Sequence, residues 1–203
     1  MVEAPILTRL AHETEVHHAE ADADIDRFLF TPRPTAEDYR NYLARVYGFL
    51  APLEGALAVT PGLDRIIDVR ARAKAAFVAR DLVALGASLP LIGRLPICLS
   101  VPAFRGAAAA LGWLYTAERP MLAAAMIRRH LSTQLPVEID QASAYLGCYD
   151  GVVSTRWRDL GNAMQRIAAT EVIADRIVDA AREAFRAQRR WRMTDLDQVR
   201  LAV

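Results

Sequence analysis

The scarcity of strand signals is the feature that most constrains the fold of this chain. Alanine, leucine and arginine are frequent along its 203 residues, and all three are good helix formers. No β-branched run of strand length is bounded by turn residues, and no tight turn separates two such runs. We therefore expect an all-α fold, a bundle of packed helices, in which residues 1–203 form a single domain.

Local signals divide the chain into helices. Thr35 is expected to cap a helix, with Asp38 three residues later as an acidic capping box. The first helix is expected to break near its middle, and the second to break at Pro52. The Pro- and Gly-rich stretch 86–102 is expected to be a connector. The expected helices span residues 5–30, 36–60, 64–85, 104–117, 121–131, 139–146, 154–170 and 171–192.

Composition excludes several function classes. The formal net charge is +1, so the chain lacks the strong excess of basic residues that is typical of general nucleic-acid binding. Cys98 and Cys148 belong to no Cys/His cluster, so we expect no zinc site and a reducing compartment. The N-terminus has no basic region followed by an apolar run, and Arg94 and Arg105 interrupt the most apolar region. We expect a cytoplasmic protein without a signal peptide or a membrane-spanning segment.

Three of the four histidines lie on the first expected helix, and helical geometry separates them. With Leu7 at zero and about 100° per residue, His18 falls near 20°, on the apolar face. His17 falls near 280°, at the rim, and His12 near 140°, facing away. His18 is therefore the histidine expected to point inward.

An inward imidazole has two interpretations. His18 could be a core histidine that bonds a carbonyl or hydroxyl group. It could instead be an axial ligand to a flat metallocofactor between two helices. No second histidine lies at ligand spacing, which argues against a metal site with several imidazoles. Haem needs one protein ligand on one side only.

A second wall for such a cofactor is offered by residues 114–125. Ala123, Ala124 and Ala125 present little bulk, and Pro120 frees the carbonyl of Thr116 and so kinks or splits the helix. The alternative is that the alanines only fill a helix and that Pro120 begins a new one.

Taken in order, several motifs resemble the haem oxygenase family, most closely the bacterial biliverdin-producing branch associated with phytochromes. The resemblance covers essentially the whole chain. The motifs that carry it include Leu10-x-x-x-Thr14-x-x-x-His18, Tyr47-Gly48-Phe49-x-x-Pro52-Leu53-Glu54, Asp81-Leu82-x-x-Leu85-Gly86, Leu111-Gly112-Trp113-Leu114-Tyr115-x-x-Glu118 and Ala184-Phe185-x-x-x-x-x-Trp191. The second of these, together with the order of the whole set, is the specific part of the resemblance.

The resemblance implies that haem is both cofactor and substrate, held between the first helix and the kinked helix and cleaved to biliverdin, carbon monoxide and iron. It makes His18, beside Thr14, the proximal ligand, with His17 as the adjacent alternative, and places Ala123 and Ala124 in the distal wall. The chain has no Gly-rich dinucleotide fingerprint, so an external electron donor is expected, such as a ferredoxin or a reductase. A phytochrome or another signalling protein is a possible partner.

Two further residues take roles from the same resemblance. Arg158 lies where the family tends to place a basic residue for the haem propionates, a task that suits a guanidinium fork. Phe185 corresponds to an aromatic residue that packs near the haem. The alternatives are a solvated arginine and ordinary core packing.

The chain departs from the family over the haem. The family pattern Glu-Gly-Ser-Thr-Leu-Gly-Gly is replaced by residues 118–124, so that all three glycines are lost. Methyl groups of Ala123 and Ala124 then stand where backbone and haem are expected to touch. Either the kink at Pro120 restores the room, or the fold survives as a non-catalytic sensor or regulatory protein that binds haem or no ligand.

Overall fold

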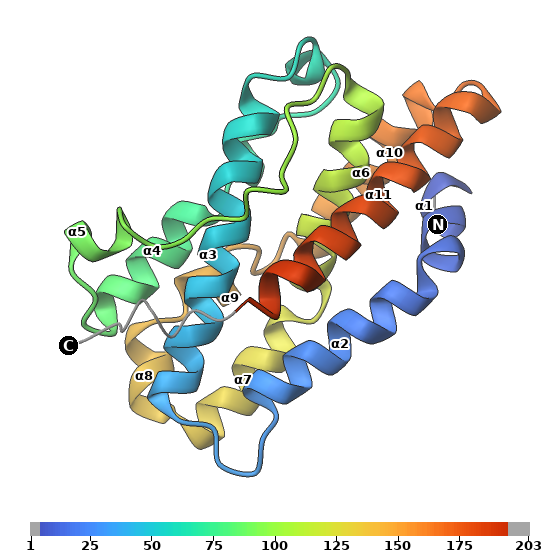
Figure 1. Cartoon of the computed structure of the whole chain (residues 1–203). Coiled ribbons are helices and arrows are strands. Elements are labelled where there is room, and N and C mark those ends of the chain that lie inside the picture. The colour runs from blue at the N-terminus through green and yellow to red at the C-terminus, as the bar shows by residue number, and fades with distance from the viewer. Residues whose placement is uncertain (1–4, 195–203) are drawn as a thin grey trace.

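The computed structural model describes residues 5–194, and this part of the chain is helical without any β-strand. Figure 1 shows the arrangement, in which α11 crosses the molecule beside α2. The α-helices are α1 (Pro5–Glu13), α2 (Glu15–Leu29), α3 (Ala36–Ala58), α4 (Ala75–Ala84), α5 (Leu89–Ile92), α6 (Ala107–Glu118), α7 (Ala124–Gln134), α8 (Pro136–Gln141), α9 (Ala144–Gly147), α10 (Val153–Ile167) and α11 (Glu171–Arg192), and the 3-10 turns are η1 (Leu63–Arg65), η2 (Arg70–Arg72) and η3 (Arg119–Leu122).

The centre of the fold is α6. Ten of its residues are buried, among them Trp113 and Tyr115, so this helix is apolar on all sides, as a helix surrounded by others must be. Its most extensive contact is with α11. Gly112 makes this contact close, because a Cβ at this position would lie 2.4 Å from the carbonyl oxygen of Ile177 and 2.8 Å from the Cβ of Ala180.

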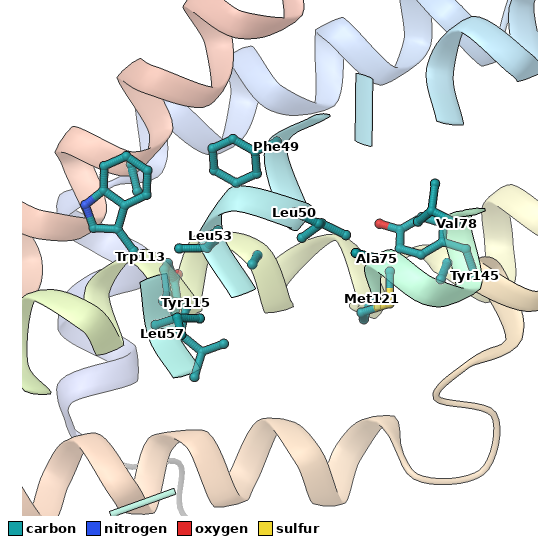
Figure 2. Close-up of a cluster of buried hydrophobic side chains, with 14 of the residues drawn as sticks. Phe49, Leu50, Leu53, Leu57, Ala75, Val78, Trp113, Tyr115, Met121 and Tyr145 are labelled. Atoms are coloured by element: carbon teal, nitrogen blue, oxygen red, sulfur yellow. The ribbon is translucent and has the colours of Figure 1, made fainter. Parts of the chain in front are cut away.

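Apolar side chains of α3 and α4 complete the core around α6. Phe49 stacks on Trp113 with 6.2 Å between the ring centroids. Figure 2 shows this cluster, with Trp113 and Tyr115 of α6 on one side, Val78 and Tyr145 of α4 and α9 on the other, and Leu50 and Leu53 of α3 between them. Its labelled members are Phe49, Leu50, Leu53, Leu57, Ala75, Val78, Trp113, Tyr115, Met121 and Tyr145.

Several local expectations are confirmed. The first helix breaks at Thr14, between α1 and α2. Thr35 caps α3 in a capping box, since its backbone N–H donates to Asp38 and its hydroxyl accepts from the Asp38 N–H. The break expected at Pro52 is wrong, because Pro52 lies inside α3 without ending it. The last expected helix, 171–192, matches α11.

The expected helix over residues 64–85 is wrong. The chain forms η1 and η2 there, and α4 begins only at Ala75. The cause is a long-range contact, because the Glu54 carboxylate on α3 accepts from the backbone N–H groups of Lys74 and Ala75. These are donors that a helix running through this point would use internally.

Two smaller expectations are also corrected. The connector 86–102 contains the short helix α5, which begins after Ser88, whose hydroxyl accepts from the backbone N–H of Leu91. The expected helix 139–146 is divided between α8, which begins at Pro136, and α9. Pro136 at the first turn of α8 is favourable because that position needs no backbone donor.

Within residues 5–194, no helix is both long enough and apolar enough to cross a bilayer. Cys98 is buried, Cys148 is half-buried, and both thiols are free.

We predict that Gly112→Val destabilises the fold by about 3 kcal/mol, because the new side chain collides with the backbone of α11. Gly55→Ala is the matched control, since Gly55 lies in α3 with nothing within 4 Å of an added Cβ. That substitution should stabilise the protein by up to about 1 kcal/mol. Urea denaturation of both variants checks the prediction, and equal stabilities would contradict it.

Candidate functional site

His18 lies half-buried on α2 and faces α6. Its Nε2 is 2.9 Å from the Thr14 hydroxyl oxygen and 3.1 Å from the Tyr115 hydroxyl oxygen. The Thr14 hydroxyl donates to the carbonyl oxygen of Leu10, which leaves its oxygen to accept from an Nε2–H group. His18 Nε2 thus lies within hydrogen-bond distance of two hydroxyl oxygens, of which the Thr14 oxygen can accept its proton. A contact of this kind is what the core-histidine interpretation expects. Coordination of a metal through Nε2 would require the proton to lie on Nδ1 and both hydroxyls to give way.

The environment of His18 keeps its imidazole neutral. Burial lowers the pKa of His18 to about 4, and the nearby positive charge of Arg119 acts in the same direction. At neutral pH the ring therefore carries no charge. A neutral imidazole is the form that coordinates metal ions.

Aromatic side chains surround this histidine. Phe185, buried on α11, meets the His18 ring edge-on with 5.2 Å between centroids, and His17 stacks on the same phenyl ring at 5.9 Å. Tyr115 is buried on α6 and lies beside Trp157 of α10 at 5.4 Å. His12 is exposed, as helical geometry predicts, whereas His17 and His18 are both half-buried.

The segment opposite α2 is split at Pro120, as expected. Helix α6 ends at Glu118, η3 follows, and α7 begins at Ala124. Ala124 is buried, and Ala123 is half-buried in the wall of a cavity of about 260 Å³ between α2 and α7. The wall of this cavity consists of Asp22, Ile25, Asp26, Phe30, Arg119, Leu122, Ala123, Met126 and Ile127.

An ion pair crosses from η3 to α2 at this cavity. The two terminal nitrogens of Arg119 donate to the two carboxylate oxygens of Asp22 at 2.9 and 3.1 Å. Asp22 lies one helical turn after His18, on the same face of α2. The ion pair therefore joins the two elements that would have to separate to admit a flat ligand beside His18.

The sequence-predicted site residues do not all meet in one place. His18 contacts both Thr14 and Phe185, and Ala123 lines the adjoining cavity. Arg158 lies on the exposed side of α10 and is not part of the cavity wall. Among the described residues, no cluster of three or more His, Cys, Asp or Glu side chains could hold a metal ion. A metal at His18 would need its other ligands from a cofactor.

The chain also buries a charged cluster that sequence reasoning missed. Glu118, at the end of α6, pairs with Arg72 at 2.6 Å and with Lys74 at 2.5 Å. The Tyr149 hydroxyl donates to the same carboxylate, and burial, together with the negative charge of Glu118, raises the pKa of Tyr149. All three charged side chains are at most 3% exposed. Sequence reasoning missed this cluster because it placed Arg72 and Lys74 on a regular helix over residues 64–85. No local signal indicates that these two side chains pair with Glu118.

No protein-family model matches this chain, and no curated protein shows significant similarity to it. The resemblance to haem oxygenases therefore rests on the motifs and their order.

We predict that Glu118→Gln destabilises the protein by about 3–5 kcal/mol, because it leaves two buried cations without a carboxylate. The matched control is Asp150→Asn, which removes an exposed ion pair with Arg128 and should change stability by less than about 1 kcal/mol. Thermal denaturation of the two variants separates these outcomes. A Glu118→Gln variant as stable as the control would show that the cluster contributes nothing.

We predict that the His18 imidazole stays neutral from pH 8 to about 5 and takes up a proton only near pH 4. The unfolded chain binds this proton at the ordinary pKa of about 6.5. The stability associated with neutral His18 is therefore complete above pH 6.5 and declines as the pH falls towards 4. Histidine NMR titration measures the midpoint, with His18→Gln to assign the resonance. A midpoint near 6.5 would mean that the ring is solvated.

Proposed function

We propose that this protein is a haem oxygenase-like haem-binding protein of the cytoplasm that takes haem beside His18 and cleaves it oxidatively. The observation that supports haem binding is the half-buried, neutral imidazole of His18. Asp22, one helical turn later on α2, lies in the wall of the cavity between α2 and α7. Oxidative cleavage is inferred from the resemblance of the chain to haem oxygenases.

The side chains around His18 fit a haem on its proximal side. His18 offers the single nitrogen ligand that haem requires, and Phe185 provides an apolar neighbour for a ring face. Ala123 and the apolar side chains of the adjoining cavity fit the other wall. Because this cavity is smaller than typical ligand pockets of roughly 300–1,000 Å³, α2 and η3 must move apart to admit the ring.

The residues of this chain have three tasks in the proposed reaction. His18 supplies a neutral ligand, Phe185 and the apolar cavity wall exclude water, and the break at Pro120 sets the distance of Ala123 and Ala124 from the ligand. Haem, when bound, would supply oxygen activation and would itself be the substrate that yields biliverdin, carbon monoxide and iron. Electrons would come from an external donor, a ferredoxin or a reductase, and a phytochrome or another signalling protein is a candidate partner.

A second candidate function is non-catalytic haem binding, or regulation without haem. Two observations favour it. The His18 Nε2 already contacts two hydroxyl groups, and the Arg119–Asp22 ion pair holds η3 against α2. The two alanines in place of the family glycines add methyl groups to the same wall.

A haemin titration tests the proposed function. We expect a saturable one-to-one Soret band, with affinity reduced about tenfold or more in His18→Ala and unchanged in the exposed control His12→Ala. Decay of the band to a bilin spectrum, after addition of a reductase in air, would indicate oxygenase activity. A stable band would favour the non-catalytic candidate, and the absence of any saturable band would contradict haem binding.

We also predict that Ala123→Gly combined with Ala124→Gly raises the rate of haem cleavage, because it removes two methyl groups from the distal wall. Ala125→Gly is the matched control, since Ala125 is exposed on the same helix. Single-turnover kinetics measures the effect. Equal rates in the double variant, the control and the wild-type protein would show that these methyl groups do not limit turnover.

A further inference from the structure

We infer that the cavity between α2 and α7 binds a small primary amine that carries an apolar group, with the Asp26 carboxylate as the partner of its ammonium. The inference concerns the cavity in its present form, closed by the Arg119–Asp22 ion pair, and it goes beyond the proposed function. It requires neither haem nor His18, which is not part of the cavity wall.

The charges of the cavity wall favour a cation. The wall contains two carboxylates, Asp22 and Asp26, and one guanidinium, Arg119, which leaves it with a net charge of −1. Both terminal nitrogens of Arg119 donate to Asp22, so these two charges neutralise each other. Among the residues that the structure describes, no cation forms an ion pair with Asp26. One carboxylate of the wall is therefore left for a ligand.

The position of Asp26 on α2 makes its charge unfavourable in the free protein. Asp26 follows Asp22 by four residues, so the two carboxylates are neighbours on one face of the helix, and like charges at this spacing destabilise a helix. A negative charge close to the C-terminal end of α2 at Leu29 also opposes the helix dipole. Arg119 compensates only Asp22, and an ammonium group beside Asp26 would compensate the second carboxylate.

The rest of the wall fits an apolar group attached to the cation. Ile127 is buried, whereas Leu122 is 50% exposed and Met126 is 58% exposed. Phe30 also lines the cavity, and its ring stacks on His130 with 4.3 Å between the centroids. These side chains form a hydrophobic surface that the chain itself leaves partly uncovered. A hydrated inorganic cation would bury none of it, but the hydrocarbon part of an amine would.

The size and charge of the cavity restrict the ligand further. Its volume is about 260 Å³, below the roughly 300–1,000 Å³ of typical ligand pockets. We therefore expect an arylalkylamine or a short alkylamine and no larger polycyclic compound. An anionic ligand is disfavoured, because the unpaired carboxylate of Asp26 would repel it.

Isothermal titration calorimetry with matched probes tests the inference without any haemin. The probes are 2-phenylethylamine, 2-phenylethanol and methylamine. The alcohol has the same skeleton as the first amine without its charge, and methylamine has the charge without the large apolar group. We expect the wild-type protein to bind 2-phenylethylamine about tenfold or more tightly than either of the other two probes.

Two variants locate the binding within the cavity. Asp26→Asn should lose the preference for the amine over the alcohol, because the partner of the ammonium is gone. Ala123→Leu should weaken the binding of both by about tenfold, since the larger side chain fills part of the cavity and leaves both carboxylates in place. The matched control is Asp140→Asn, at an exposed aspartate of α8 outside the cavity wall, which should bind both probes as the wild-type protein does.

Several results would overturn the inference. Equal affinities of the wild-type protein for 2-phenylethylamine and 2-phenylethanol would do so, as would no binding of the amine at millimolar concentration. A preference for the amine that persists in Asp26→Asn would exclude this carboxylate as its partner. Equally tight binding of methylamine would exclude recognition of an apolar group, and unchanged binding by Ala123→Leu would place the amine outside the cavity. These outcomes are independent of the haemin titration that tests the proposed function.

Discussion

The close crossing of α6 and α11 at Gly112 determines where the candidate site lies. With no Cβ at this position, the α6 backbone packs directly against the backbone of Ile177 and the methyl group of Ala180. This crossing brings Tyr115 of α6 and Phe185 of α11 together, with 6.2 Å between their ring centroids, and His18 of α2 contacts both rings. A larger residue at Gly112 would separate these rings as well as the two helices.

The buried charges at the end of α6 connect this core to the candidate site. Glu118 pairs with both Arg72 and Lys74, and these two ion pairs hold the 70–74 segment against α6. The next residue is Arg119, which begins η3 and reaches across to Asp22. A rigid anchor at Glu118 therefore precedes an exposed ion pair, and an ion pair of that kind contributes little to stability. This contrast is the physical basis for expecting η3, rather than α6, to move when a ligand enters.

Local signals predicted the parts of the fold that depend on local interactions. The capping box at Thr35, the split at Pro120 and the inward direction of His18 could be read from neighbouring residues because each depends on spacing along one helix. The segment 64–74 could not, since its conformation depends on Glu54 and Glu118, which lie far away in sequence. For the same reason, no local signal predicted that the Tyr115 hydroxyl, 97 residues from His18, contacts its Nε2.

The central claim is that His18 is the axial ligand of bound haem, and resonance Raman spectroscopy of the ferrous haem complex tests it most directly. The account predicts an iron–histidine stretching band in the wild-type protein that is lost in His18→Ala and recovered when imidazole is added to that variant. The His12→Ala protein should retain the band, because His12 is an exposed residue of α1, whereas His18 lies on α2. An unchanged band in His18→Ala, or no such band in the wild-type complex, would contradict the account.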